Sequence, residues 1–464
     1  MAKLQDSKLK TDKSATKTAG KHKVEDMNAV SGSKATTKAD KDKDLTKKLV
    51  LTGADIVTIG EESEILVGGK NYNTAVISQV EGVRTPQFRA ISALAFHQLL
   101  DEAKVSGSLI RKAVDKEYAR IDWNDPEINK DSEFLQKFVR NLAKEIRASL
   151  EQDAAQAQTK LRSFINHVVE GFATSPEGID NLRKRSVLVQ VAILSAPLPK
   201  EVEESARQAY REICKEAGED SVPVAVRSSA AGEDSRKKAF AGLQDTYLNI
   251  VGEDAVAQAY HWDCASAYNL RSMTYRREAI LDAMAKTEAT GDESFAEKAK
   301  EEWAIENTSL SVCLMRMINP VISGTAFSAD TATGCRGTDR DDLVSIDVSY
   351  GLGEAVVGGI VTPDKYEVFQ RDDGEPVVIR HMGCKDVKIV YDDKGGTKKV
   401  PVPENEIYRW SIPISTAESI ACGVRAITRT YGGIIMDTEF CIDNEGELWF
   451  VQARPETRWN EELE

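Results

Sequence analysis

The segment from Met436 to Thr457, with the sequence MDTEFCIDNEGELWFVQARPET, constrains the fold of this chain more than any other segment. Asp437 and Glu439 occupy alternate positions, so both carboxylates leave the same face if the segment forms a strand. The Asp-Asn-Glu-Gly run at 443–446 predicts a turn, and the Leu-Trp-Phe-Val run at 448–451 predicts a returning strand. The segment therefore predicts a β-hairpin that carries two carboxylates on one face.

Two further polar side chains extend this hairpin. Gln452 and Arg454 take alternate positions at the end of the second predicted strand. Two carboxylates, an amide and a guanidinium suit one Mg²⁺ and a polyphosphate, because the cation prefers hard oxygen ligands and the guanidinium forms a bidentate pair with phosphate. The alternative is a surface hairpin with a cross-strand ion pair, and the segment alone does not decide between the two.

Length and composition indicate a globular protein with roughly two to four domains or lobes. The sequence has no run of about 18 apolar residues, so no membrane span is predicted, and it lacks the apolar N-terminal segment of a signal peptide. Seven scattered cysteines without a C-x-x-C pair favour reduced thiols and a cytoplasmic protein. The formal net charge of −14 argues against general binding to nucleic acid.

The N-terminal segment differs from the rest of the chain. Residues 1–48 hold thirteen lysines, seven acidic residues and no aromatic residue. Such a segment buries too little apolar surface to offset the entropy lost on ordering, so we predict a disordered tail. It either contacts an acidic partner subunit or only increases solubility, and its composition fits both.

A pair of glycines precedes a lysine early in the folded sequence. Residues 56–59 are predicted as a strand, Gly68-Gly69-Lys70 follows, and a helix is predicted from 72 to 80. Two glycines let the backbone approach a ligand while the ammonium of Lys70 reaches a phosphate. The run is not a Walker A loop, and Gly-Gly turns followed by lysine are also common without a bound phosphate.

Helical periodicity dominates residues 92–215, where apolar residues recur at three- and four-residue spacing, and it returns at 255–310. The run VPVAVRSSAAGEDS at 222–235 separates the two regions. Its apolar strand ends at Arg227, and an arginine beside two serines is suited to hold an anion. The following segment FAGLQDTYLN at 240–249 suggests a glycine loop that closes over phosphates. Each feature alone also fits an ordinary connection.

The second half of the chain is predicted to contain mostly strands. Further strands are predicted at 311–317, 321–330 and 343–348, a hairpin at 387–390 and 397–402, and a helix at 417–431. Gly351 and Gly353 predict a tight turn that presents the carboxylate of Glu354 to the hydroxyls of a ribose. The Gly-Leu-Gly run lacks the third glycine and the βαβ context of a dinucleotide-binding fingerprint, so that alternative is rejected.

Several motifs occur in one order that is specific to a known family. They read VGGKN at 67–71, VRSSAAGEDS at 226–235, FAGLQDTYLN at 240–249, SGTAFSADTATG at 323–334, YGLGEAVVGGIVTPDKY at 350–366, CKDVKIVYDDKGG at 384–396 and the closing MDTEF…FVQARPET. The chain resembles, over roughly residues 55–457, the nucleotide-binding module of phosphoenolpyruvate synthase and pyruvate phosphate dikinase, a member of the ATP-grasp class. The helical region 101–212 matches least.

The resemblance implies a role for each matching residue. ATP and Mg²⁺ are the implied cofactors. The residues implied for the phosphates are Lys70 and Arg227, with a lid at Gly242, Gln244 and Thr246. Asp437 and Glu439 would bind Mg²⁺, and Gln452 and Arg454 would contact the metal-bound phosphate. Glu354 would hold the ribose, with Met315 and Met317 near the adenine.

The chain also departs from the family pattern. The usual Pro-Pro-Gly-Phe segment reads Thr-Pro-Gln-Phe at 85–88, and Phe327-Ser-Ala-Asp-Thr331 lacks the expected proline. Full-length members continue into a swivelling phosphohistidine domain and a substrate-binding barrel, whereas this sequence ends soon after Thr457. None of its five histidines lies in a T-x-H or S-H-A motif, so the acceptor histidine is expected on another protein.

These observations predict an α/β ATP-grasp fold with an inserted helical subdomain. The predicted organisation is a tail at 1–48, a first lobe at 49–100 plus 213–254, a helical subdomain at 101–212 and a second lobe at 255–464. The predicted function is that of the ATP-binding subunit of a split dikinase, which phosphorylates a histidine on a partner subunit for a small acceptor such as phenol, as in phenylphosphate synthase. A substrate-binding subunit is expected too.

Three alternatives stay open at this point. The first is a split phosphoenolpyruvate synthase that acts towards pyruvate. The second is a non-catalytic ATP sensor of a partner enzyme, which retention of the metal-ligand residues disfavours. The third is that the sequence is a piece of a longer enzyme.

Overall fold

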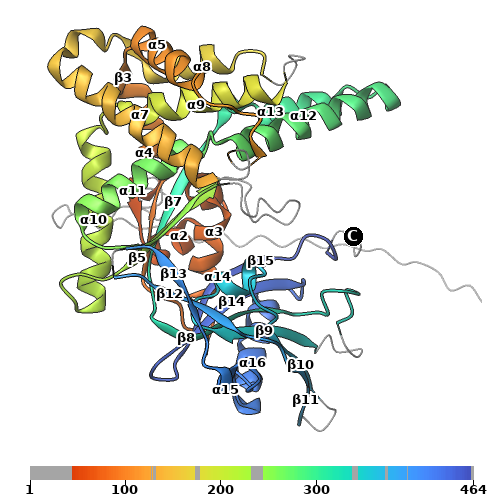
Figure 1. The fold of residues 1–464 in the computed structure, drawn as a ribbon. Coiled ribbons are helices and arrows are strands. Elements are labelled where there is room, and N and C mark those ends of the chain that lie inside the picture. Colours follow the sequence, from red (N-terminus) through yellow and green to blue (C-terminus); the bar gives the residue numbers. More distant parts are fainter. Residues whose placement is uncertain are drawn as a thin grey trace, which may run out of the picture. The chain divides into compact units, whose positions relative to one another are not determined.

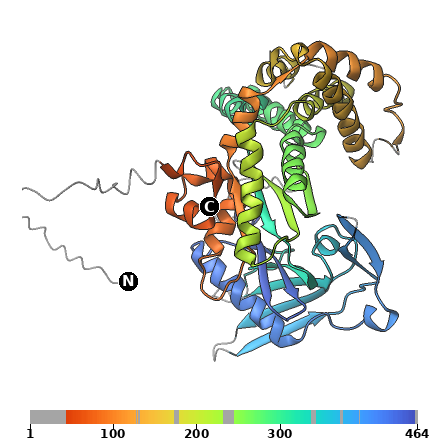
Figure 2. The same cartoon turned by 90° about the vertical axis from the view of Figure 1, so that its left-hand side faces the viewer.

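The computed structural model describes residues 44–126, 128, 132–172, 178–230, 244–336, 343–370, 375–393 and 395–460. The predicted disorder of the N-terminal tail concerns mostly residues outside these ranges and stays a prediction. The described residues combine many helices with two larger antiparallel sheets (Figures 1 and 2), which confirms the predicted α/β class. No helix in these ranges is long and apolar enough to cross a membrane.

The first sheet has five strands in the order β1-β2-β7-β5-β6. Their bounds are Val50–Leu51 for β1, Phe88–Ile91 for β2, Leu310–Arg316 for β7, Val224–Ala230 for β5 and Thr246–Ile250 for β6. Strand β7 pairs with both β2 and β5, so the chain returns to this sheet after the mostly helical segment 251–309. The lobe boundary predicted at residue 255 is therefore wrong, because β7 belongs to the first sheet and the second sheet begins only at Pro320.

Helices α2 (Gly53–Ile59) and α3 (Ser63–Ile77) pack on one face of this sheet. The strand predicted at 56–59 is wrong, because this β-branched run lies in α2. Thr52 starts the helix: its hydroxyl accepts from the Asp55 amide at 3.1 Å, and the Asp55 carboxylate accepts from the Thr52 amide at 3.0 Å. This capping box satisfies two helix-end groups and outweighs the strand preference of the residues that follow.

The helical regions predicted at 92–215 and 255–310 are confirmed. They contain α4 (Ala93–Glu102), α5 (Gly107–Tyr118), α7 (Ser132–Gln152), α8 (Leu161–Val169), α9 (Ile179–Ser195), α10 (Lys200–Ala217), α11 (Glu253–Ser266), α12 (Leu270–Thr290) and α13 (Ser294–Trp303). Short elements interrupt them, namely β3 (Lys104–Val105), β4 (Thr159–Lys160), η1 (Ala154–Gln156) and η2 (Ile305–Asn307). These helices share one apolar core with β5 and β7.

The second sheet has six strands in the order β11-β10-β9-β8-β14-β15. They are β8 (Pro320–Phe327), β9 (Val344–Tyr350), β10 (Asp364–Gln370), β11 (Pro376–His381), β14 (Met436–Asp443) and β15 (Leu448–Pro455). Helix α16 (Ile414–Thr430) packs on one face of this sheet (Figure 1). Its apolar residues share a core with Met436 and Phe440. The predicted hairpin at the end of the chain and the helix before it are both confirmed.

The remaining elements lie next to this sheet. The hairpin predicted around 387–402 is present as β12 (Val387–Tyr391) and β13 (Thr397–Pro401). Two helices of one turn each, α14 (Glu354–Val357) and α15 (Glu404–Ile407), complete the second half. The carbonyl of Ile389 in β12 accepts from the Leu352 amide at 2.9 Å, which places α14 beside this hairpin.

A buried histidine in α11 makes stability depend on pH. His261 is 6% exposed, and its Nε2–H donates to the carbonyl of Ile193 in α9 at 2.9 Å. Burial, followed by the charge of Arg147, lowers the pKa of His261 from 6.5 to about 3. Below its ordinary pKa the unfolded chain takes up a proton at this site and the native protein does not, so stability falls as the pH drops from 6.5 towards 3.

We expect this histidine alone to cost roughly 2 kcal/mol of unfolding free energy at about pH 5, relative to neutral pH. The measurement is urea unfolding of the wild type and of His261→Gln at about pH 7.5 and about pH 5. Glutamine cannot be protonated, so the variant should lose less stability between the two conditions. An equal loss of stability in both proteins would contradict the lowered pKa of His261.

Candidate functional site

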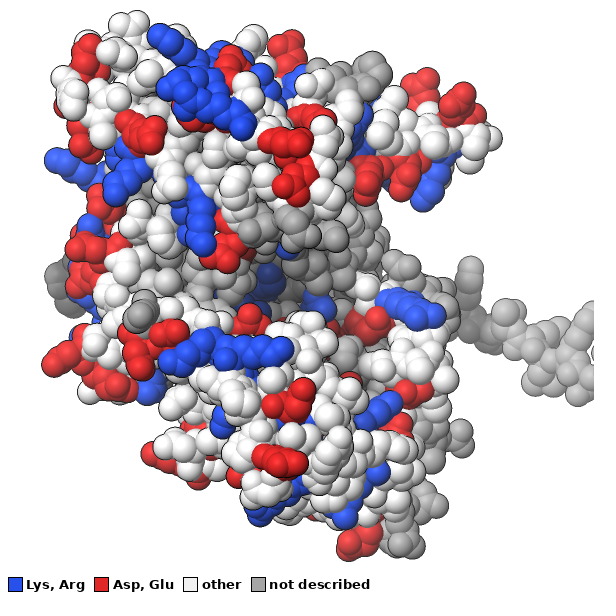
Figure 3. All heavy atoms as spheres, viewed as in Figure 1, with Lys and Arg blue, Asp and Glu red and all other residues white. Residues whose placement is uncertain are grey.

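The first sheet meets the second where β5 faces the β14–β15 hairpin. Arg227 of β5 donates from Nη2 to the side-chain oxygen of Gln452 in β15, and the same Nη2 lies 3.7 Å from the Glu439 carboxylate in β14. In the space-filling view a recess opens between the two parts of the molecule, and Lys or Arg atoms lie in it (Figure 3). Three residues that are far apart in sequence therefore form one polar cluster.

The strand register fixes the hairpin side of this cluster. Asp437 lies opposite Arg454, and Glu439 lies opposite Gln452. Arg454 reaches the Oδ2 of Asp437 with Nε at 2.8 Å and with Nη2 at 2.8 Å. Met436, Thr438 and Phe440 are buried between these positions, so the predicted alternation is confirmed and both carboxylates lie on the face away from α16.

Helix α3 approaches β5 because of a break at Gly68. The backbone there has φ 72° and ψ 164°, inside a segment that is helical on both sides. A Cβ at this position would lie 2.2 Å from the carbonyl oxygen of Ser229, and the positive φ is itself unfavourable for other residues. The helix start predicted at 72 is thus wrong, since the glycines interrupt a helix that starts at Ser63.

This break places Lys70 beside β5. Its Nζ donates to the carbonyl of Ser228 at 3.1 Å. The hydroxyl of Ser229 donates to the Val67 carbonyl at 2.8 Å and accepts from the Asn71 amide at 3.2 Å, which holds both halves of α3 against the strand. Lys70 of α3 and Arg227 of β5 therefore extend from neighbouring elements.

An apolar cavity of about 370 Å³ continues from this cluster. Its lining includes six of the residues predicted for the site, namely Arg227, Thr246, Met315, Met317, Glu354 and Glu439. Thr246 begins β6 and lies opposite Arg227 in the strand pairing. The Glu354 carboxylate accepts from the Thr397 hydroxyl at 3.0 Å, so it is presented from α14 at the cavity and tied to β13.

The remaining predicted residues do not line this cavity. Lys70, Asp437, Gln452 and Arg454 lie in the adjoining polar cluster through the contacts above. The buried side-chain oxygen of Gln244 has no hydrogen-bond partner among the described residues, and Gly242 lies outside them, so the predicted lid stays a prediction.

One residue of this region was missed by the sequence interpretation. Asn249 in β6 has φ 57°, and its side-chain amide donates to the carbonyls of Asp392 at 3.0 Å and Gly396 at 3.2 Å. It thereby joins the first sheet to the turn of the β12–β13 hairpin beside the cavity. Asparagine tolerates a positive φ better than most residues, but nothing in the sequence indicates its distant partners.

The oxygen donors of the polar cluster suit a magnesium ion. Among the described residues, no group of three or more His, Cys, Asp and Glu side chains is placed to hold a metal. The available set is smaller: two carboxylates, Asp437 and Glu439, and the amide oxygen of Gln452. Mg²⁺ commonly takes only one or two carboxylates and completes its shell with water and phosphate oxygens, so this donor set fits the ion.

A larger cavity, of about 870 Å³, lies among the helices and contains none of the residues predicted for the site. Its size does not make it the nucleotide site, because it lacks the polar cluster formed by the two sheets. The smaller cavity combines an apolar interior with cations and carboxylates at one end, which is the arrangement that a nucleotide base and its phosphates require.

Comparison with known proteins gives concordant matches. The family model described as "Pyruvate phosphate dikinase, AMP/ATP-binding domain" matches residues 64–464. Phosphoenolpyruvate synthase of Synechocystis sp. is 34% identical over 294 residues, or 60% of this chain and 33% of that protein. The probable phosphoenolpyruvate synthase of Pyrococcus horikoshii is 28% identical over 404 residues, or 85% of this chain and 42% of that protein.

A relative whose name refers to rifampicin also matches. The rifampicin phosphotransferase of a Streptomyces species is 29% identical over 395 residues, or 84% of this chain and 34% of that protein. In all three alignments the matched region spans well under half of the relative's length.

Proposed function

This chain belongs to the family of pyruvate phosphate dikinase AMP/ATP-binding domains, and from that premise we propose that it binds Mg·ATP and transfers a phosphoryl group to a histidine of a separate subunit. The observation that carries the proposal is the contact of Arg227 in the first sheet with Gln452 and Glu439 in the second. It brings cations, carboxylates and an apolar cavity together in one site. By analogy with the family, the β-phosphoryl group is transferred, and AMP and phosphate are the products.

The cations of the cluster would stabilise the transferring phosphoryl group. Lys70, Arg227 and Arg454 carry positive charge that offsets the negative charge on the polyphosphate oxygens, which is the main contribution of protein groups to phosphoryl transfer. Asp437, Glu439 and Gln452 would hold Mg²⁺, which when bound neutralises further phosphate charge.

The observed ion pairs support this division of roles. Arg454 contacts Asp437, and Arg227 contacts Glu439 and Gln452, so each arginine lies next to the oxygen donors of the cluster. A polyphosphate and a cation would use the same side chains with exchanged partners: the phosphates pair with the guanidiniums, and the cation binds the carboxylates. The groups are therefore already held close to where the ligands need them.

The acceptor histidine is proposed to lie on a partner subunit. None of the residues that line the 370 Å³ cavity in the described part of the chain is a histidine. His261 is buried in α11, and His97 is bonded to Ser309, so neither is placed to receive a phosphoryl group from this cavity. A further subunit would bind the final acceptor.

The final acceptor is proposed to be a small molecule such as phenol, as in phenylphosphate synthase. Pyruvate is the second candidate, favoured by the names of two of the relatives. The name of the third relative refers to rifampicin, which indicates that similar nucleotide modules serve different acceptors. The acceptor must therefore be identified by experiment, with the partner subunits present.

The experiment uses the purified chain with Mg²⁺ and ATP labelled separately at the β- and γ-phosphates, alone and with extract of the source cells. We expect acid-labile, base-stable β-label on a different polypeptide, formed only in the mixture together with AMP. Adding phenol or pyruvate then identifies the acceptor by the loss of that label. Tight ATP binding with neither AMP nor a labelled polypeptide would reject the transferase and leave a nucleotide sensor.

A further inference from the structure

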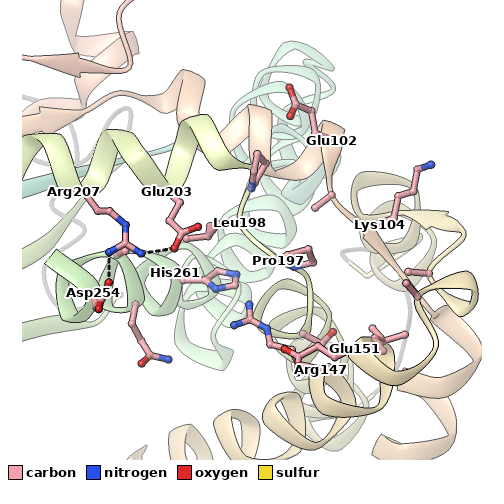
Figure 4. Close-up of a pocket in the computed structure, with 18 residues that line it drawn as sticks. Glu102, Lys104, Arg147, Glu151, Pro197, Leu198, Glu203, Arg207, Asp254 and His261 are labelled. Atoms are coloured by element: carbon pink, nitrogen blue, oxygen red, sulfur yellow. Dashed lines mark hydrogen bonds and ion pairs between the residues drawn. The ribbon is translucent and has the colours of Figure 1, made fainter.

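The 870 Å³ cavity among the helices has the properties of a second ligand site. It is bounded by α7, α10 and α11 and by the segment that joins α9 to α10, and Figure 4 shows its lining side chains. Its apolar lining includes Leu150, Pro197, Leu198 and Ala257. It shares no lining residue with the nucleotide cavity, so a ligand here would not be the nucleotide of the proposed reaction.

One of the arginines in this cavity is fully neutralised by the protein. Arg207 donates to Glu203 at 2.6 Å and also pairs with Asp254, and both interactions are drawn in Figure 4. Its charge and its donors are therefore already used. Arg207 is therefore the comparison for Arg147, which lines the same cavity.

Arg147 differs from Arg207. Its Nη2 donates to the carbonyl of Ala196 at 2.8 Å, but within the described residues no carboxylate lies within ion-pair distance. Its Nε is buried, and no described residue forms a hydrogen bond with it. A carboxylate in the cavity that pairs with this guanidinium would supply the anionic partner that the described residues do not provide.

His261 supplies a neutral acceptor beside this cation. Its Nε2–H donates to the Ile193 carbonyl, which leaves Nδ1 as an acceptor, and the described residues offer Nδ1 no donor. The ring is 6% exposed and lines the cavity. The charge of Arg147 contributes to the lowered pKa of His261, which keeps the ring neutral near pH 7, and Figure 4 shows the two side chains next to each other.

We propose that this cavity binds a small monocarboxylate that carries an adjacent hydroxyl group and an apolar body. The carboxylate pairs with Arg147, the hydroxyl donates to Nδ1 of His261, and the apolar part packs on Leu150, Leu198 and Ala257. A dianion such as a phosphate monoester is disfavoured, because the lining holds the four carboxylates of Glu102, Glu151, Glu203 and Asp254 against three cations.

Mandelate is the probe, since it combines a carboxylate, an adjacent hydroxyl and a phenyl ring. Its matched neutral analogue is 1-phenyl-1,2-ethanediol, and phenylacetate lacks only the hydroxyl. Calorimetric titration of the full chain should show mandelate binding at least about tenfold more tightly than the diol and several-fold more tightly than phenylacetate. Inorganic phosphate should not displace it.

Arg147→Met removes the charge at nearly constant length and should weaken mandelate binding at least about tenfold while ATP affinity stays unchanged. Arg120→Met is the matched control, because Arg120 is 62% exposed and pairs with Glu117 on α5, away from this cavity. If Arg147→Met does not fold, Arg147→Lys, which keeps the charge, should retain measurable binding. Equal binding of mandelate and the diol, no mandelate binding by the wild type at about 10 mM, or equal loss in both methionine variants would overturn the proposal.

Discussion

Replacement of Lys385 by methionine is expected to lower the free energy of unfolding by about 3–5 kcal/mol. Lys385 and Asp364 are both fully buried, and their Nζ and Oδ1 atoms lie 2.6 Å apart. The carboxylate of Asp364 also accepts from the amide and the hydroxyl of Ser411, each at 2.8 Å, and from the Gly383 amide at 2.8 Å. Removing the ammonium leaves that carboxylate charged and buried, which is the main cost.

The measurement is urea unfolding near pH 7, with Arg84→Met as the control. Arg84 pairs with Glu447 at the surface, where both side chains are about half exposed, so its loss should cost less than about 1 kcal/mol. The double variant Lys385→Met, Asp364→Asn removes both charges and should recover part of the stability lost in the single variant. Equal losses of unfolding free energy in Lys385→Met and Arg84→Met would contradict the large contribution expected of the buried Lys385–Asp364 pair.

The sequence predicts the β14–β15 hairpin and the alternation of its polar residues well, for a local reason. The turn at 443–446 closes the hairpin, and strand alternation places Asp437 and Glu439 on one face. The cross-strand pairing is different, because the register shifts by one residue between Glu439 and Phe440, and only this shift places Glu439 opposite Gln452 and Asp437 opposite Arg454. The alternation depends on residues close in sequence and is predictable, whereas no local pattern indicates the bulge.

The failures concern features set by distant contacts or by local competition. The strand predicted at 56–59 forms a helix because the capping box at Thr52 outweighs its β-branched residues. Strand β7 joins the first sheet through pairing with β2 and β5, which no local pattern reveals. The bond of Arg227 to Gln452 spans 225 positions, and the family resemblance implied only that both residues contact the phosphates.

The Glu439→Gln variant is expected to lose phosphoryl transfer by about 10²–10³-fold. Glu439 lines the 370 Å³ cavity and lies 3.7 Å from Arg227, so its charge lies where this cavity meets the polar cluster. Glutamine keeps the size and one oxygen donor but removes the charge that a divalent cation requires. The rate is measured as β-label transferred to the partner polypeptide at saturating ATP.

Glu447→Gln is the matched control on the same hairpin, because Glu447 lies at the turn, pairs with Arg84 and does not line the cavity. It should transfer label at the wild-type rate. Binding of ATP without metal should change less than about tenfold in Glu439→Gln, since the apolar cavity and the cations are unchanged. A variant that keeps full transfer activity at low Mg²⁺ would exclude Glu439 from the metal site.

Glu439→Gln also distinguishes a transferase from a nucleotide sensor, because the two functions need Glu439 for different reasons. A sensor responds to occupancy of the cavity, and occupancy depends mainly on the apolar lining and on Lys70 and Arg227. A transferase must also stabilise charge on the transferring phosphoryl group, and that demand arises only in the transition state. Regulation of a partner that persists in Glu439→Gln would therefore favour the sensor, whereas retained ATP binding with lost transfer and no residual effect on the partner would favour the transferase.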